Sequence, residues 1–505
     1  MGEISKTSSG TKGSPFLRQC FITASVCVNI IGHGCVIGFS AILLPSLRLP
    51  ESHIHATTSE ESWIVSIVGF ALVVGNFIIT SIIDVAGRKK SHLMTILPVM
   101  VGWFLLLMVN DVAGLIISRF LQGVAMGMLG PLGSIIIGEM TDPKNRGPFL
   151  TGVSLSLTIG VLFCHSLGTF FSWQQSALIC SFITFTSCLL IIFTPESPSW
   201  LIAKGRIEEA REVFIWLRGD DEQQLDELEK MIAAQQMARK YSIVDQNMTV
   251  GVRIRRFFRH LGENIKKPEF YKPVIIMALL YVMFQFAGIN VISSYTTDII
   301  KQVVGPEANA KVIMVALDIE RLLCNLLAVY LMKVMKRRSL LFSSGAICIL
   351  AYFGKAGYVY AKQNDLLPFD GQWLPLGLIG IYMFSLTVGI SSIPFAVSGE
   401  IFPLEYRGLG SGISILGLSL NFFIALKCFP VLTINIGLPL TYCLYASVVF
   451  ACLSVIWFML PETKDKTLQE IEDGFRGLSP ADMKSVEPLK RREEMLRRSS
   501  SHIIY

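Results

Sequence analysis

Long runs of apolar residues alternate with short polar loops along most of the chain, and this pattern predicts a bundle of membrane-spanning helices. A hydrocarbon core about 30 Å thick needs about 20 apolar residues per helical span. Backbone groups in lipid must be bonded within their own segment, which favours helices over open sheets. Twelve apolar runs meet this requirement. They lie at residues 18–46, 61–83, 91–109, 112–137, 147–169, 173–194, 273–298, 311–332, 339–360, 373–398, 408–428 and 436–460.

A polar region follows the sixth run and divides the predicted bundle into two halves. Its apolar residues, including Ile207, Val213, Phe214 and Leu217, recur at helical spacing, so we expect amphipathic helices that lie against the membrane domain. A solvated linker with marginal helices is the alternative. The predicted domains are an N-terminal tail at 1–17, a six-helix bundle at 18–194, an intracellular helical linker at 195–272, a second six-helix bundle at 273–460 and a C-terminal tail at 461–505.

Composition agrees with a membrane protein. The chain of 505 residues is 52% hydrophobic and 16% charged, whereas about a quarter of the residues in a soluble domain are charged. The net charge of +6 comes from basic residues in short loops beside the apolar runs, such as Arg88, Lys89 and Lys90. This distribution indicates membrane topology rather than binding to nucleic acid, and it predicts that both termini and the central region are cytoplasmic.

The 11 cysteines are mostly scattered singly in apolar runs, without metal-ligand spacing. We therefore expect no metal and no cofactor. Nor does the sequence contain a nucleophile–base pair or a phosphate-binding loop, so an enzyme is not expected.

The two halves repeat each other. Glu139 precedes Arg146 by seven residues, and Glu400 precedes Arg407 by the same seven. Each half is then followed by a similar short motif, PESPSW at 195–200 and PETKDK at 461–466. Two repeats of six spans suit a transporter whose halves rock about a site in mid-membrane.

Charged residues, most of them at predicted cytoplasmic helix ends, are candidates for a gate. A network of ion pairs that forms in one state and breaks in the other would couple the two halves. The alternative is that these charges only fix the topology. The candidates are Asp84, Arg88, Arg119, Glu139, Arg146, Arg337, Glu400 and Arg407.

The stretch FQFAGIN places two amides, Gln285 and Asn290, around Gly288 inside an apolar run. An amide offers a donor and an acceptor without the cost of burying a charge, which suits a hydroxylated ligand. Residues five apart on an ideal helix point about 140° apart, so both amides reach one ligand only if the helix is irregular near Gly288 or the cavity wraps around it. Hydrogen bonds between helices are the alternative role.

The eighth run contains three charges, Asp318, Glu320 and Arg321. A charge at the centre of a span costs about 2.5–3.5 kcal/mol on insertion scales. Asp318 and Arg321 are three residues apart, so the sequence favours a local pair along one helix face. A second hypothesis is that Arg321 lines the cavity and favours anionic or differently shaped ligands.

Several motifs together resemble the sugar-porter family of the major facilitator superfamily, most closely its insect facilitated trehalose transporter-like members. The resemblance covers about residues 20 to 475. The motifs are GRKK after the second run, SRFLQG in the fourth, Glu139 with Arg146-Gly147, PESPSWL, GIN in the seventh run, Glu400-Ile-Phe-Pro with Arg407-Gly408, and PETKDKTLQEI.

The resemblance implies an all-helical polytopic membrane protein with the major facilitator fold and twelve spans in two six-helix pseudo-repeats. It implies alternating access to a central sugar site, with trehalose or glucose as the expected substrate. Gln285 and Asn290 match amides that contact sugar hydroxyls in this family, Gly288 lies between them, and Asn421 matches a further asparagine. The family also implies the plasma membrane, and a monomer is compatible with it.

The chain departs from the family pattern at the expected sugar site. Phe284 replaces the first of two glutamines, Phe395 replaces a tryptophan, and Ser154 replaces another glutamine, which predicts a smaller and more apolar cavity. The first run offers only His33 in place of the carboxylate typical of proton-linked relatives, so we expect facilitated diffusion. A sugar sensor that no longer transports, or a transporter of another small organic solute, are the remaining alternatives.

Overall fold

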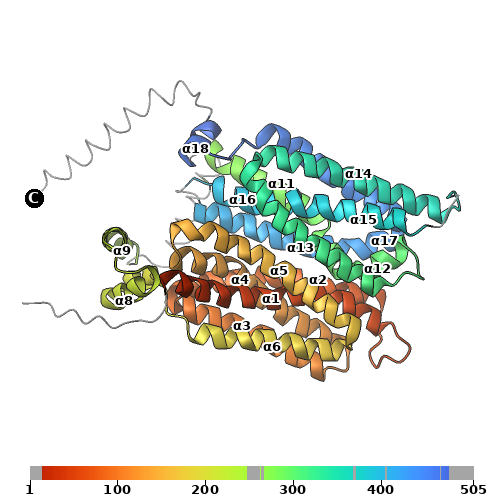
Figure 1. The fold of residues 1–505 in the computed structure, drawn as a ribbon, viewed down its shortest axis with the longest axis horizontal. Helices are drawn as coiled ribbons and strands as arrows, with labels where there is room; N and C mark the ends of the chain where they lie inside the picture. Colours follow the sequence, from red (N-terminus) through yellow and green to blue (C-terminus); the bar gives the residue numbers. More distant parts are fainter. Residues whose placement is uncertain are drawn as a thin grey trace, which may run out of the picture. The chain divides into compact units, whose positions relative to one another are not determined.

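A computed structural model describes residues 14–246, 262, 267–367, 371–403, 407–466 and 468–476, with the side chains at 235–246, 407, 468 and 469 left aside. The regular structure of these residues consists of helices, with no strand among them (Figure 1). Most of both predicted tails, and part of the predicted linker, lie outside the described residues. The expectation of an all-helical fold is confirmed.

Six long helices form the first half and match the first six predicted spans. Two of them begin with capping boxes, at Thr57 with Glu60 and at Ser172 with Gln175, which bond N–H groups that have no partner within the helix. These helices are α1 (Pro15–Leu47), α2 (Thr58–Ala86), α3 (Arg88–Met108), α4 (Val112–Met140), α5 (Pro143–Phe170) and α6 (Trp173–Ile192).

Small residues let these helices approach closely. Gly34 of α1 faces Gly160 of α5, and Gly75 of α2 faces Gly127 of α4. A Cβ atom at any of the four positions would lie 2.1–2.3 Å from a backbone carbonyl oxygen of the facing helix. Close backbone packing of this kind stabilises helices in lipid, where burial of apolar surface contributes little to their association.

The second half contains more irregular helices. Gly437 has φ 80° and ψ 160° inside α17, so that helix covers two predicted spans, 408–428 and 436–460. A π-helical turn interrupts the tenth predicted span. The elements are α11 (Pro268–Phe286), α12 (Ile289–Val303), α13 (Ala310–Val334), α14 (Arg337–Gln363), α15 (Trp373–Ser385), the π-helical turn (Leu386–Ile390), α16 (Ser392–Glu400) and α17 (Arg407–Met459).

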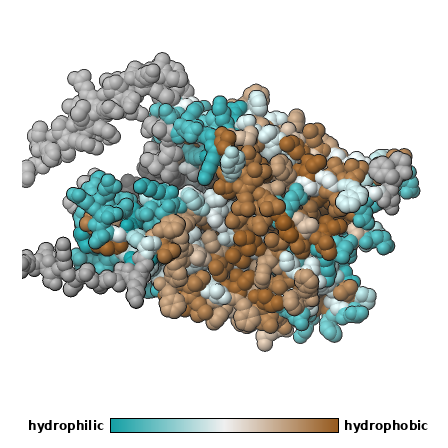
Figure 2. All heavy atoms as spheres, in the orientation of Figure 1, coloured by the Kyte–Doolittle hydropathy of each residue, from teal (hydrophilic) through white to brown (hydrophobic). Residues whose placement is uncertain are grey.

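The described chain contains ten helical segments long and apolar enough to cross a membrane, by length and composition. One of them, Gly408–Met459, is the bent helix that covers two predicted spans, and α13 is a further helix made more polar by its three central charges. All twelve predicted spans are therefore helical. In the first unit, apolar side chains cover the outer faces of α3 and α6, while hydrophilic ones gather over α8 and α9 (Figure 2).

The region after the sixth span folds into short amphipathic helices. Phe214 and Leu217 are buried, and Arg18 and Gln19 of α1 donate to the carbonyls of Trp216 (2.6 Å) and Leu217 (3.1 Å). The predicted docking against the membrane helices is confirmed for α8. The helices are α7 (Pro198–Ala203), α8 (Ile207–Arg218) and α9 (Glu222–Gln246), and a further short helix, α18 (Leu468–Arg476), follows the last span.

Contacts divide the chain into two compact units that combine segments from both halves of the sequence. The predicted bundles at 18–194 and 273–460 are repeats in sequence, whereas these units are groups of residues in contact, so the predicted domain boundaries stay a prediction. The first unit comprises Met1–Met248, Asn290–Asn325 and Phe422–Pro430, and the second comprises Thr249–Ile289, Leu326–Asn421 and Val431–Tyr505.

Candidate functional site

The seventh predicted span is broken inside the FQFAGIN stretch. α11 ends at Phe286, α12 begins at Ile289, and Gly288 between them has a φ of 91°. A Cβ atom at Gly288 would lie 2.6 Å from the hydroxyl oxygens of both Tyr352 and Tyr382. Only glycine suits this backbone and this space. The helix therefore has the irregularity that the two amides require.

The amides lie on either side of the break and are both buried. Gln285 is 1% exposed in the last turn of α11, and Asn290 is 7% exposed in the first turn of α12. Gln285 belongs to the second unit and Asn290 to the first. A buried amide stays hydrogen-bonded, and it exchanges one partner for another at little cost when the new partner is a hydroxyl.

Two tyrosines hold the backbone at the break. The hydroxyls of Tyr352 in α14 and Tyr382 in α15 both donate to the carbonyl oxygen of Ala287, at 2.8 and 2.6 Å. The two hydroxyl oxygens are 3.2 Å apart. Because the carbonyls at the end of a helix have no partner within it, these bonds satisfy an acceptor that the break exposes.

A buried polar network lies in the first unit, where α5, α12 and α13 meet. His165 Nδ1 lies 2.5 Å from the Asp318 carboxylate, and His165 Nε2 lies 3.2 Å from the Ser293 carbonyl oxygen. Arg321 donates to the Ser293 hydroxyl at 2.6 Å. The predicted local pair of Asp318 with Arg321 is therefore wrong, because Asp318 pairs with a histidine of another helix. Glu320 is half-buried and forms no ion pair among the described residues.

The first charge cluster is built around Arg88, the first residue of α3. Arg88 donates two hydrogen bonds to Glu139, at 2.8 and 2.9 Å, and lies 3.6 Å from Asp84. The Ser197 hydroxyl donates to the same Glu139 carboxylate at 2.5 Å. Glu196 accepts the backbone N–H groups of Arg88 and Lys89, at 2.7 and 3.1 Å. Glu196 of the PESPSW motif, 108 residues after Arg88 in the chain, thus caps the N-terminus of α3.

The second charge cluster repeats these contacts around Arg337, the first residue of α14. Arg337 donates to Glu400 at 3.1 Å, and the Thr463 hydroxyl donates to the same carboxylate at 2.6 Å. Glu462 accepts the backbone N–H groups of Arg337 and Arg338, at 3.0 and 3.1 Å. Partial burial disfavours the charged form of Glu462, but its backbone N–H donors outweigh that effect and lower its pKa.

The sequence named four further candidates, and the structure describes the side chains of three of them. Arg119 is 1% exposed within α4 and donates to Gln122 and Ser40, both at 2.9 Å, so it links α4 to α1. Arg146 keeps its Nε atom buried without a hydrogen-bond partner among the described residues. The side chain of Arg407 lies outside the described residues. Asn421 is partly buried and donates to the Gly417 carbonyl at 2.8 Å.

A third cluster, which the sequence did not reveal, fastens α12 to the first helices of the chain. Arg48 donates to Glu61 at 2.5 and 2.8 Å and to Asp298 at 2.6 Å. The hydrogen bonds to Glu61, with help from Asp298, raise the pKa of Arg48. Thr297 adds a bond to the Ala41 carbonyl at 3.0 Å. α12, the second half of the broken span, is therefore held by charged and polar contacts.

Sequence reasoning also missed His165 and Lys355. A titratable residue inside a span is costly and marks a functional candidate, so this signal was available for His165. Lys355 lies close to the end of a predicted span, where a lysine ordinarily reaches the interface. Only the fold shows that it is buried.

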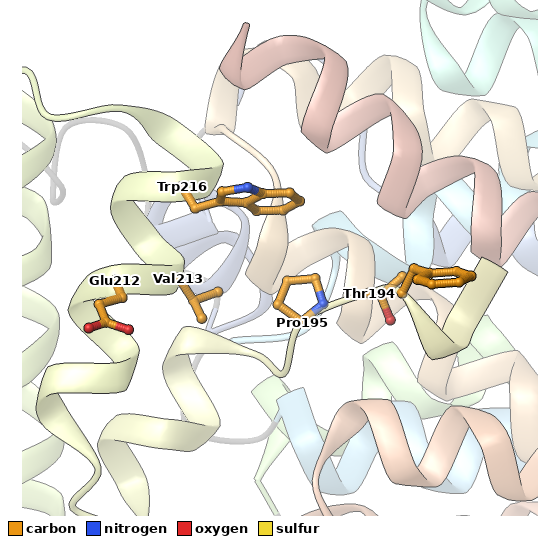
Figure 3. A pocket seen from close by; sticks show the side chains of 6 residues that line it. Thr194, Pro195, Glu212, Val213 and Trp216 are labelled. Atoms are coloured by element: carbon orange, nitrogen blue, oxygen red, sulfur yellow. The ribbon is translucent and has the colours of Figure 1, made fainter. Parts of the chain in front are cut away.

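A cavity of about 360 Å³ lies where α8 packs near the end of α6. Val213 and Trp216 extend from α8 toward Pro195, as Figure 3 shows, and Phe193 and Thr194 complete the lining with Glu212. This largely apolar lining is far in sequence from the broken span and contains one titratable group. The described residues contain no cluster of three or more His, Cys, Asp or Glu side chains that could hold a metal ion.

Comparisons with known proteins agree with this architecture. The family model "Sugar (and other) transporter" matches residues 16–475. The facilitated trehalose transporter Tret1 of Apis mellifera ligustica is 27% identical over 476 residues, which cover 92% of this chain and 90% of the relative. Tret1 of Bombyx mori is also 27% identical, over 86% of this chain and 83% of the relative.

Solved structures show the same fold. The proton:xylose symporter XylE, bound to 6-bromo-6-deoxy-D-glucose, superposes with a TM-score of 0.69 at 18% sequence identity, covering 92% of this chain and all of the symporter chain. An inward-open conformation of the E. coli xylose transporter XylE gives a TM-score of 0.68 at 18% identity, over 91% of this chain and 99% of the other.

Proposed function

Since this chain belongs to the sugar (and other) transporter family and has the major facilitator fold of a membrane transporter, we propose that it carries a small neutral sugar across the bilayer by facilitated diffusion. Trehalose and glucose are the first substrates to test. Trehalose is motivated by the two Tret1 relatives, which are 27% identical over most of the chain. Glucose follows from the sugar-porter resemblance.

The observation that supports the proposal is the broken helix at Gly288, with a buried amide on each side. Broken helices build mid-membrane ligand sites in transporters because their free backbone groups and flanking side chains face a cavity. We propose Gln285 and Asn290 as sugar contacts, with Gly288 permitting their geometry and Asn421 as a further contact. Neutral amides favour a hydroxylated and uncharged cargo.

We propose that ion pairs at the helix ends gate the transport cycle. Arg88 with Glu139 and Arg337 with Glu400 are geometrically suited, because each pair is partly buried and joined to a neighbouring motif. A pair with these properties holds one conformation and is replaced by water in the other. The proposed set is Asp84, Arg88, Glu139, Arg146, Arg337, Glu400 and Arg407, together with Arg119, which lies within α4 and acts through hydrogen bonds to Gln122 and Ser40.

The protein is a multi-pass membrane protein, and we propose the plasma membrane with both termini in the cytoplasm. Basic residues that directly follow α2 and α13, including Arg88, Lys89, Lys336 and Arg338, support this orientation under the positive-inside rule. A monomer suffices for the proposed mechanism, since each chain carries both repeats.

Uptake into liposomes tests the proposal. Purified protein should give saturable, counterflow-capable flux of labelled trehalose or glucose, and Gln285→Leu or Asn290→Leu should raise KM by about tenfold or more, since an unpaired sugar hydroxyl is costly. Asn435→Leu is a matched control, because Asn435 is an exposed amide bonded to its own helix at 2.9 Å. Sugar binding without flux would instead indicate a sensor.

Transport of another organic solute is a second candidate, and the buried network of Asp318, Arg321 and His165 favours it. Arg321 is charged where the family often has a neutral asparagine, which suits a ligand with an anionic group. Under this candidate, Arg321→Asn shifts uptake from organic anions toward neutral sugars. An unchanged substrate profile and rate would remove Arg321 from the site.

A further inference from the structure

Lys355 is a buried cation surrounded by aromatic rings. It lies in α14, is 2% exposed, and forms no ion pair with a carboxylate in the described part of the chain. Its Nζ atom lies 3.3 Å from the ring centroid of Tyr382, 4.4 Å from that of Tyr352 and 4.5 Å from that of Tyr442. An ammonium group over aromatic faces is attracted by their negative quadrupole, and the attraction grows when water is excluded.

The same rings reach the broken helix. Tyr352 and Tyr382 donate their hydroxyls to the Ala287 carbonyl, directly before Gly288. The ring faces of these tyrosines thus contact Lys355, and their hydroxyl groups form the hydrogen bonds to the Ala287 carbonyl at the break. All of these residues belong to the second unit, as does Gln285. Two aromatic side chains therefore connect the Lys355 ammonium to the Ala287 carbonyl, two residues from Gln285.

We infer that Lys355 is a positioning residue: by fixing the Tyr352 and Tyr382 rings, it sets the break at Ala287–Gly288 and aims the Gln285 amide. This inference rests on the proposed function, in which Gln285 contacts the sugar. It explains why a costly lysine lies inside a span with no carboxylate partner among the residues that the structure describes. Packing alone would be served as well by an apolar side chain.

Transport kinetics test this role. Lys355→Met is expected to raise KM for the transported sugar about three- to thirtyfold, the range spanned by cation–π attractions of buried groups, while the maximal rate changes less. Lys355→Arg keeps the cation over the rings and should restore most of the affinity. Tyr382→Phe keeps the ring and removes one bond to Ala287, so it should also raise KM.

A double variant shows whether Lys355 and Tyr382 act on KM through the same network of contacts. Lys355→Met with Tyr382→Phe should raise KM by less than the product of the single effects, because residues in one network are not additive. Lys427→Met is the matched control, since Lys427 Nζ lies 4.0 Å from the Trp63 ring centroid and both residues belong to the first unit, whereas Lys355 belongs to the second. It should leave KM unchanged.

Hydrogen exchange separates this inference from the proposed function. In ligand-free protein, Lys355→Met should accelerate exchange in peptides covering residues 286–291, whether or not any sugar is transported. Faster exchange with no sugar flux by the wild type would retain the positioning role and reject the proposed function. Wild-type exchange and wild-type KM in Lys355→Met would overturn the inference. If Lys355→Met folds poorly, KM and hydrogen exchange measured on Lys355→Arg and Tyr382→Phe test the positioning role instead.

Discussion

Arg88 and Arg337 begin corresponding helices in the two repeats and make corresponding contacts. Each donates to a glutamate of the same half, to a backbone carbonyl five residues earlier, and, through its backbone N–H, to the glutamate of the PES or PET motif. A hydroxyl of that motif, from Ser197 or Thr463, completes each cluster. The repeat therefore preserves a set of contacts.

The two clusters differ in charge. Arg88 forms two bonds to Glu139 and has Asp84 four residues earlier, whereas Arg337 forms one bond to Glu400 and has Lys333 at the matching position. The second cluster has thus lost a peripheral carboxylate and gained a like charge. Both clusters contain the carboxylate–hydroxyl–helix-cap unit. Because Arg337 forms one bond to its central carboxylate and Arg88 forms two, we expect the second cluster to be the weaker.

The largest expected effect comes from removing the central carboxylates. Because hydrogen bonds to charged groups contribute about 1.5–3 kcal/mol, Glu139→Gln should lower the initial rate of sugar uptake into liposomes about tenfold, and Glu400→Gln by less. Glu229→Gln, which removes an exposed pair with Arg211, should have no effect. If Glu139→Gln and Glu400→Gln lowered the uptake rate equally, the expected difference in strength between the two clusters would be rejected. If neither variant lowered the rate, these charges would serve only to fix the topology.

The hydroxyl donors give the next effect. Ser197→Ala and Thr463→Val each remove one bond to a carboxylate, worth about 1.5–3 kcal/mol, whereas Glu139→Gln weakens three such bonds at once. Ser197 also accepts the Trp200 N–H at the start of α7, at 3.4 Å, so its loss should lower the thermal unfolding midpoint in detergent more than the loss of Thr463. The reverse order would show that the PET motif, and not the PES motif, holds the tighter cluster.

Acid should weaken the second cluster through Glu462. The folded state holds the pKa of Glu462 below that of the unfolded chain, so its stabilising effect is present above about pH 4.3, the ordinary pKa of glutamate, and is lost as pH falls through the lower folded pKa. Unfolding midpoints measured from pH 7 to pH 3 should fall less steeply for Glu462→Gln than for the wild type. Parallel curves would exclude Glu462 as a contributor.

Exchanging the peripheral charges should have the smallest effect. Asp84→Lys removes a carboxylate that is 83% exposed, and Lys333→Asp supplies Arg337 with the missing one. Pairs of this spacing contribute about 0.2–0.5 kcal/mol, so Asp84→Lys should slightly lower and Lys333→Asp slightly raise the unfolding midpoint at low salt. Both shifts should vanish near 1 M salt, and a shift that persists there would have another cause.

The fold itself was predictable because its signals are local. Runs of about 20 apolar residues define helices in lipid whatever their neighbours are, and all twelve predicted spans are helical. The sequence left open whether the helix is irregular near Gly288 or the cavity wraps around it, and the structure shows the irregular helix. The repeated Glu-to-Arg spacing and the PES and PET motifs predicted two related halves. The two charge clusters agree with this prediction, because they contain corresponding hydrogen bonds.

The partners of individual charges were not predictable in the same way. Asp318 was expected to pair with Arg321 on its own helix and instead pairs with His165. Lys355 gave no sequence signal of burial, and no pattern related it to tyrosines on α15 and α17.

From its residues alone, the chain determined that it crosses a membrane as helices and that it is built from a repeat, and it marked Gly288 as a place where the seventh span could be irregular, since hydropathy and glycine act within a few turns of one helix. Only the tertiary structure decided which buried charge meets which partner. A desolvated charge takes whichever compensating group the packing of distant helices brings within about 3 Å, and that choice is made between segments far apart in sequence.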